Sequence, residues 1–70
     1  MTAVRRATVN GEPAEIGPGT TVADIVAVWC PSGRGIAVAR NGEVVPRSAW
    51  GGEPVRAGDA IEIVTAVAGG

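Results

Sequence analysis

Short apolar runs separated by glycine-containing turns make up the first part of the chain. Residues 3–10 predict a first strand, and residues 14–16 predict a strand that returns beside it. The pair Asn10-Gly11 favours a tight turn between two such runs, and residues 11–13 are expected to reverse the chain. The glycines and proline of residues 17–19 then end the second strand. The chain is therefore expected to begin with a β-hairpin.

A helical pattern follows the hairpin. Thr21 with Asp24 three residues later resembles a capping box with Asp in the place of Glu, which marks a helix start. Apolar side chains recur behind it at i, i+3, i+4 and i+7, namely Val22, Ile25, Val26 and Trp29. Pro31 and the glycine-rich residues 32–35 end the pattern. A short helix with one apolar face is predicted, and that face needs a sheet to cover.

A second hairpin is predicted after the helix. Residues 36–40 and 43–45 favour strands, and Asn41-Gly42 between them is the strongest short hairpin signal in the sequence. Residues 47–50 are expected to form a single tight turn of helix, and residues 51–54 a loop.

The last strand is predicted to start after the turn at Gly58-Asp59. Alternate positions share one face, with Ile61, Ile63, Thr65 and Val67 opposite Glu62, Val64 and Ala66. Because both faces are partly apolar, this strand is expected at the centre of the sheet. The order β-β-α-β-β-β predicts an α+β fold, a β-grasp roll with one mixed sheet of about five short strands on one helix. Residues 1–70 are interpreted as a single domain.

Composition supports a folded core and narrows the function. The 70-residue chain is 46% hydrophobic, but it lacks Leu, Phe and Tyr, so Val, Ile and Ala with Trp29 and Trp50 are expected to fill the core. The net charge is −1 and the arginines are scattered, which disfavours nucleic-acid binding. Histidine is absent and Cys30 is the single cysteine, so neither a metal site nor a catalytic nucleophile with its base is expected.

Location and interaction with membranes follow from similar observations. No run approaches the ~20 apolar residues of a membrane span, and no basic, then apolar leader precedes a cleavage site. A cytoplasmic protein with no membrane partner is therefore expected.

The C-terminal residues are the strongest functional candidates. The predicted last strand runs into Val67, Ala68, Gly69 and Gly70, which place a free α-carboxylate on a narrow and flexible tail. A bare diglycine can enter another protein's active site where a larger side chain would clash. A carboxylate presented in this way can be activated as an acyl-adenylate, with Gly69, Ala68 and Val67 recognised as an extended segment by strand addition.

The sequence resembles the ThiS family, the small ubiquitin-like sulfur carriers of thiamin thiazole biosynthesis. The resemblance covers essentially the whole chain in order. The matching segments are Val9-Asn10-Gly11, Thr21-Val22, Asn41-Gly42-Glu43-Val44-Val45-Pro46-Arg47 with Trp50, and Gly58-Asp59-Ala60-Ile61-Glu62-Ile63 running into Val67-Ala68-Gly69-Gly70.

The resemblance implies a role as a protein cosubstrate rather than an enzyme. A ThiF-type adenylyltransferase would use ATP to adenylate the carboxylate of Gly70. A persulfide relay fed by a cysteine desulfurase would then leave a thiocarboxylate at Gly70. That group would donate its sulfur to the thiazole synthase ThiG. The domain itself would bind no cofactor, because ATP is used by the partner enzyme.

Several single residues have two interpretations. Arg47 and Trp50 could mark a partner-binding surface, since both residue types favour interface hot spots, or Trp50 could close the small core above a solvated Arg47. Cys30 is interpreted as a small packed hydrophobe. Asp59 is interpreted as a turn former whose carboxylate binds nearby backbone N–H groups.

Two other functions stay open. A molybdopterin-synthase small subunit (MoaD-like) or another thiocarboxylate carrier would keep the chemistry and change the pathway. The Ile63-Val64-Thr65-Ala66 segment disfavours the former, since such tails usually have Pro-Pro or an aromatic residue there. A β-grasp interaction module without carrier chemistry is the alternative from another class.

Overall fold

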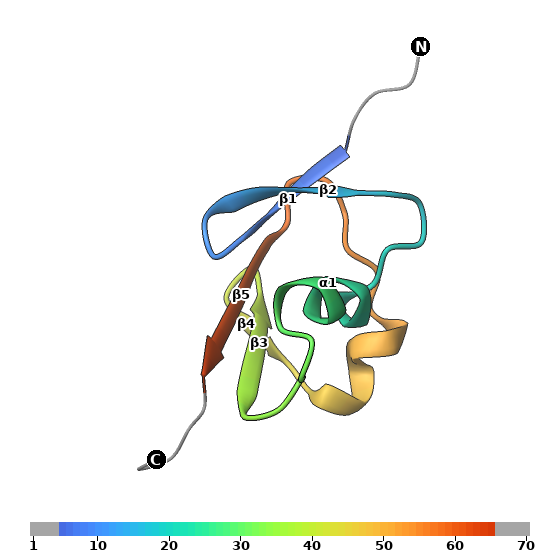
Figure 1. The fold of residues 1–70 in the computed structure, drawn as a ribbon. Helices are drawn as coiled ribbons and strands as arrows, with labels where there is room; N and C mark the ends of the chain where they lie inside the picture. Colours follow the sequence, from blue (N-terminus) through green and yellow to red (C-terminus); the bar gives the residue numbers. More distant parts are fainter. Residues whose placement is uncertain (1–4, 66–70) are drawn as a thin grey trace.

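We describe residues 5–65 of the chain from a computed structural model. The elements, in order, are β1 (Arg5–Val9), β2 (Glu12–Ile16), α1 (Val22–Trp29), β3 (Ile36–Arg40), β4 (Glu43–Val45), the 3-10 helix η1 (Arg47–Gly52) and β5 (Ala60–Thr65). All five strands belong to one sheet, and α1 packs across one of its faces (Figure 1). The α+β fold of the β-grasp type predicted from the sequence is confirmed.

The strand order in the sheet is β2-β1-β5-β3-β4. β5 therefore lies at the centre, as predicted, parallel to β1 and antiparallel to β3. Two antiparallel hairpins, β1–β2 and β3–β4, flank it. The last strand in the sequence thus lies between the two hairpins and joins them into one sheet.

Both hairpins close through a two-residue Asn-Gly turn. Asn10 and Asn41 each have φ of 52°, and Gly11 and Gly42 have φ of 82° and 84°, the positive values that a type I′ turn requires. Because this turn uses two residues only, β2 already starts at Glu12, opposite Val9. The prediction that residues 12 and 13 belong to the turn was therefore wrong, as was the prediction that Asn10 belongs to the strand.

The start of α1 is fixed as the sequence predicted. The Asp24 N–H donates to the Thr21 hydroxyl at 3.3 Å, and the Thr21 N–H donates to the Asp24 carboxylate at 2.9 Å. The two bonds satisfy donors that a helix start leaves without partners in the helix itself.

The apolar face of α1 is shorter than its periodicity indicated. Val22, Ile25 and Val26 are buried, but Trp29 is 38% exposed. The assignment of Trp29 to the core was therefore wrong. Trp29 is the last residue of an eight-residue helix, and the packing of this face against the sheet is completed one turn earlier.

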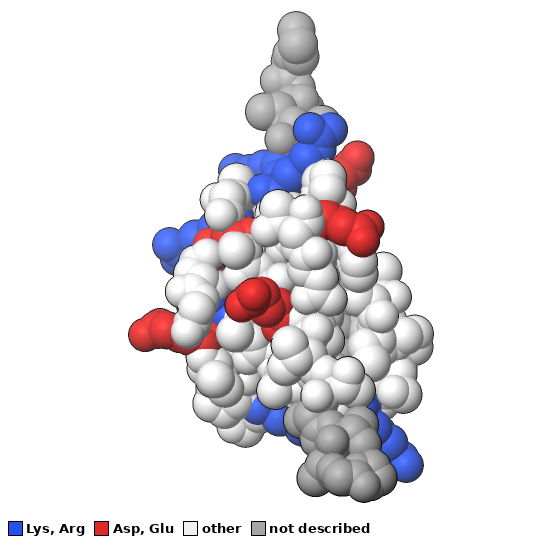
Figure 2. Space-filling view, turned by 90° about the vertical axis from the view of Figure 1, so that its left-hand side faces the viewer, with Lys and Arg blue, Asp and Glu red and all other residues white. Residues whose placement is uncertain are grey.

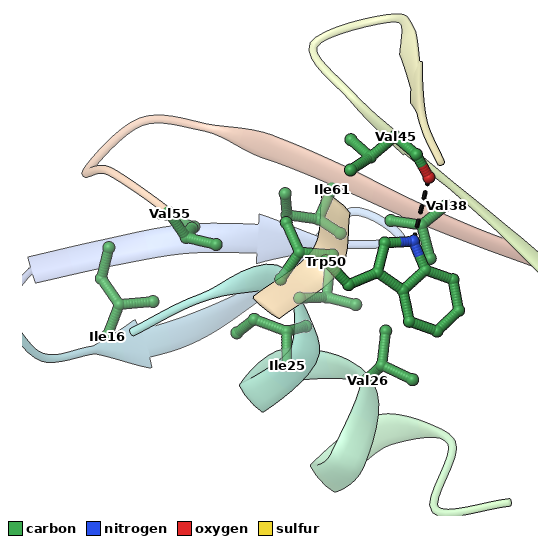
Figure 3. Packing of buried hydrophobic residues seen from close by; sticks show 11 residues of the cluster. Ile16, Ile25, Val26, Val38, Val45, Trp50, Val55 and Ile61 are labelled. Carbon is green, nitrogen blue, oxygen red and sulfur yellow. Dashed lines mark hydrogen bonds between the residues drawn. The ribbon is translucent and has the colours of Figure 1, made fainter. Parts of the chain in front are cut away.

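The core lies between α1, η1 and the inner face of the sheet (Figure 3). Its buried residues are Ala7, Val9, Ile16, Val22, Ile25, Val26, Val38, Val45, Trp50, Val55 and Ile61. η1 extends to Gly52, so the residues 51 and 52 predicted as loop continue the helical turn. Every strand contributes to this single core, which is built from Val, Ile, Ala and Trp50.

Candidate functional site

The predicted working end of the chain lies outside the described residues. The roles assigned to Gly70, Gly69, Ala68 and Val67 therefore stay predictions. What the structure describes is the base of that tail, the last residues of β5, and the surfaces around it.

Thr65 ends β5 opposite Ile36, the first residue of β3. The pairing between β5 and β3 covers five residue pairs and reaches Thr65. The pairing between β5 and β1 is much shorter, with Thr8 opposite Ala60 and Val9 opposite Ile61. Near its end, β5 is therefore paired with β3 on one side, while its pairing with β1 on the other side has already stopped.

The two hairpin asparagines attach β5 through their side chains, a feature that the sequence analysis did not identify. The Ile63 N–H donates to the Asn10 side-chain oxygen at 2.8 Å, and the Ala60 N–H donates to the Asn41 side-chain oxygen at 2.9 Å. Each asparagine thus continues the hydrogen bonding of the sheet after its own strand has ended. The Asn-Gly pairs indicated the turns, but no local signal indicates a bond between residues 53 positions apart.

The sheet face opposite α1 presents exposed apolar side chains. Val44 is 73% exposed and Val64 is 56% exposed. With Ala37, Ala39 and Glu62 they line most of a shallow hollow of about 220 Å³ on β3, β4 and β5. Figure 2 shows the side of the molecule on which β5 lies; basic side chains gather toward its ends, and its middle combines uncharged atoms with acidic side chains. An exposed apolar area of this kind is typical of a contact surface.

Trp50 is a core residue. It is 8% exposed, and its indole Nε1–H donates to the Val45 carbonyl oxygen at 2.9 Å (Figure 3). The guanidinium carbon of exposed Arg47 lies 5.2 Å from the centre of the indole ring. The interpretation of Trp50 as a side chain that closes the core therefore fits its burial. A partner-binding role for the Arg47 and Trp50 pair stays a prediction, in which Arg47 would make the contact.

The loop that precedes β3 lies next to Arg47. A Cβ atom on Gly33 would lie 3.5 Å from Nη2 of Arg47, and Gly33 has φ of 62°. Because Ile36 pairs with Thr65, this loop leads directly to the end of β5. Arg47 therefore lies beside the loop that precedes β3.

A polar cluster lies at the start of β5, away from its last residue. Arg40 forms an ion pair with Glu53 at 2.7 Å and donates to the Pro54 carbonyl oxygen at 3.0 Å. The Asp59 carboxylate accepts from the Arg56 N–H at 2.9 Å and from the Asn41 amide at 3.1 Å. These contacts attach the loop of residues 53–59 to the second hairpin, and the interpretation of Asp59 as a turn former is confirmed.

Opposing effects act on the pKa of Asp59. Partial burial raises the pKa of this carboxyl group. The hydrogen bonds from the Arg56 N–H and from Asn41, together with the charges of Arg40 and Arg56, outweigh burial and leave the pKa below its usual value. The ionised form is thus the form that the folded protein stabilises.

Cys30 is partly buried and packs against the core, in agreement with its interpretation as a small hydrophobe. Its Sγ lies 3.9 Å from the Ser32 hydroxyl. Within residues 5–65, no group of three or more His, Cys, Asp or Glu side chains is arranged to hold a metal ion. In the same part of the chain, no helix has the length and apolar character needed to cross a membrane.

Comparison with known proteins places this geometry in a family. The model of the ThiS family matches residues 7–70. The fold is similar to the crystal structure of the thiamine biosynthesis protein ThiS from Geobacter metallireducens, with a TM-score of 0.73 and 32% sequence identity over 93% of this chain and 99% of that one. No curated protein matches the chain. Because the family model covers nearly the whole length and the fold agrees, the chain belongs to the ThiS family.

Proposed function

We propose that the chain is a sulfur carrier of thiamin biosynthesis that is acted on by partner enzymes and is not itself a catalyst. The match of the ThiS family model, which extends through residue 70, is the observation on which this proposal rests. It includes the terminal diglycine within the family pattern. The similar structure from Geobacter metallireducens is itself a thiamine biosynthesis protein.

The chemistry that we propose takes place at the carboxylate of Gly70. A ThiF-type enzyme transfers AMP from ATP to this carboxylate and releases pyrophosphate. The acyl carbon becomes a good electrophile, because AMP is a far better leaving group than an oxide ion. A persulfide sulfur supplied through a cysteine desulfurase then attacks this carbon and AMP leaves. A second thiol cleaves the S–S bond of the acyl persulfide, which leaves a thiocarboxylate and a disulfide. The thiocarboxylate delivers its sulfur to the thiazole synthase ThiG.

The described part of the chain supports this proposal as a rigid base for the tail. β5 is the central strand, it is paired with β1 at its start, and its pairing with β3 extends to Thr65. The exposed apolar side chains of Val64, next to Thr65, and of Val44, level with Glu62 on β4, offer a contact surface. A partner that holds the tail would contact this surface at the same time.

The proposal is tested by mass spectrometry of the protein after incubation with a ThiF-type enzyme, ATP and a persulfide source. We expect one oxygen to be replaced by sulfur, and fragmentation should locate the change at Gly70. The location is essential because oxidation of Met1 or Cys30 changes the mass by nearly the same amount. The variant Gly70→Ala, incubated in parallel, should stay unmodified at its C-terminus.

The outcomes separate the alternatives. A modified tail whose sulfur is transferred in a molybdopterin-synthase reaction, and not in thiazole synthesis, would support the MoaD-like carrier. A tail that stays unmodified with every activating enzyme would contradict carrier chemistry, and the β-grasp interaction module would then be the better description.

A further inference from the structure

The side of β5 that faces β1 has an open edge near the tail. β1 ends at Val9, and the Asn10 N–H donates to the Ile61 carbonyl oxygen at 2.9 Å. The Asn10 side-chain oxygen then accepts from the Ile63 N–H. Within residues 5–65, no residue of β1 is paired with β5 after Ile61. Figure 1 shows the β1–β2 hairpin beside the first part of β5, while the last part of β5 continues past it.

The direction of each backbone group in β5 follows from the alternation of a sheet. The Asn41 N–H donates to the Ala60 carbonyl oxygen at 2.8 Å, so the backbone groups of the even-numbered residues point toward β3. Those of the odd-numbered residues point toward β1, as the bonds to Ile61 and Ile63 show. The Ile63 carbonyl and the Thr65 N–H therefore point to the side that β1 has left.

This edge lacks the features that usually prevent strand addition. Exposed edges are commonly protected by Pro, by Lys or by a bulge, because unpaired N–H and C=O groups form a template for another strand. Here the sequence is Ile63-Val64-Thr65, three residues with a high preference for strands. Val64 and Thr65 are exposed. The open edge also lies on the strand that continues into the tail, on the sequence that any tail-processing enzyme must approach.

We propose that the enzyme that adenylates the C-terminus adds an extended segment of its own backbone to β5 at the Ile63 carbonyl and the Thr65 N–H. This inference rests on the proposed function and names how the partner engages the carrier. The enzyme's segment would form main-chain hydrogen bonds with the Ile63 carbonyl and the Thr65 N–H, and these bonds would align the carrier's tail with that segment. They do not depend on the side chains of the enzyme's segment. Asn10 defines where this pairing starts, because its side chain already occupies the Ile63 N–H.

Amide hydrogen exchange of the isotopically labelled protein, free and saturated with a ThiF-type adenylating enzyme, tests the proposal. In the free protein we expect the Thr65 amide to exchange quickly. In the complex its exchange should slow by about tenfold or more, as for amides that gain a stable hydrogen bond. The Val64 amide is the internal reference, because it points toward β3 and should be protected in both samples.

A pair of variants separates the backbone from the side chain. Thr65→Pro removes the N–H, and an edge position whose N–H points away from its neighbour tolerates proline. Its fold should persist, with enzyme affinity about tenfold lower, as the loss of roughly 1.4 kcal/mol predicts. Thr65→Ala keeps the N–H, and its affinity for the enzyme should stay within about twofold of that of the original protein, a much smaller change than the tenfold loss expected for proline.

Each outcome has a defined meaning. A Thr65 amide that still exchanges quickly in the complex, or equal losses of affinity for Thr65→Pro and Thr65→Ala, would overturn strand addition. If the unaltered protein forms its thiocarboxylate normally in either case, the proposed function stands. If it forms none, the proposed function fails, and strand addition fails with it.

Discussion

Asn10 and Asn41 each have two roles in this fold. Their backbones take the positive φ that a type I′ turn requires, and their side chains accept hydrogen bonds from the central strand. We predict that Asn10→Gly keeps the turn but loses the bond to Ile63, since glycine adopts positive φ freely. The free energy of unfolding should fall by about 1–2 kcal/mol, which lowers the melting temperature by roughly 4–8 °C for each kcal/mol. Thermal unfolding followed by circular dichroism measures this.

Asn10→Asp is the matched control for that prediction. Aspartate also tolerates positive φ and keeps an oxygen acceptor for the Ile63 N–H, so its melting temperature should stay close to that of the unaltered protein. Equal stability of the glycine variant and the unaltered protein would contradict the role of the side chain.

Asp59 should make stability depend on pH. Its pKa is lowered in the folded protein, so its contribution is complete above the ordinary aspartate pKa of about 3.9 and is lost as the pH falls through the lower folded-state value. Asp59→Asn removes the charge. We predict that this variant is less stable than the original protein near neutral pH and that the difference shrinks under acid conditions. Urea unfolding at several pH values measures it, and a difference that does not change with pH would contradict the prediction.

The elements of this fold could largely be predicted from the sequence, because their signals are local. The two Asn-Gly pairs located both hairpins, and Thr21 with Asp24 located the start of α1. The exposure of Trp29 could not be predicted from periodicity, since it depends on tertiary packing at the last residue of the helix. The open edge of β5 could not be predicted from the sequence either, because it arises when β5 pairs with β1 over fewer residues than with β3.

The outer face formed by β3, β4 and β5 yields a prediction at the level of the element. The double variant Val44→Thr and Val64→Thr keeps β-branched side chains on the strands, so the free energy of unfolding should change by less than about 0.5 kcal/mol per site. The affinity for the adenylating enzyme should fall about tenfold or more, because each substitution puts a hydroxyl group where the contact buries a methyl group, and burying an unpaired hydroxyl costs about 1–3 kcal/mol. Calorimetric titration with the enzyme measures the affinity.

Val28→Thr provides the control for that surface. Val28 is 76% exposed, but it lies on α1, which packs against the opposite face of the sheet. This variant should bind the enzyme like the original protein. A loss of affinity as large as that of the double variant would show that any exposed valine matters, and the outer sheet face would lose its special role.

At the scale of the whole molecule, the residues that stabilise the fold and those proposed to react are separate. Among the described residues 5–65, the buried core spans residues 7–61, and the proposed reactive carboxylate belongs to Gly70. We therefore predict that Gly70→Ala leaves the melting temperature within about 2 °C, less than the shift that 1 kcal/mol causes in a domain of this size. The same variant should fail to form the acyl-adenylate, because a methyl group at the last residue would clash in a site shaped for glycine. ATP–pyrophosphate exchange with a ThiF-type enzyme measures the adenylation. Normal exchange by Gly70→Ala would mean that the enzyme does not require a bare terminus, and a large fall in melting temperature would mean that the tail is part of the fold.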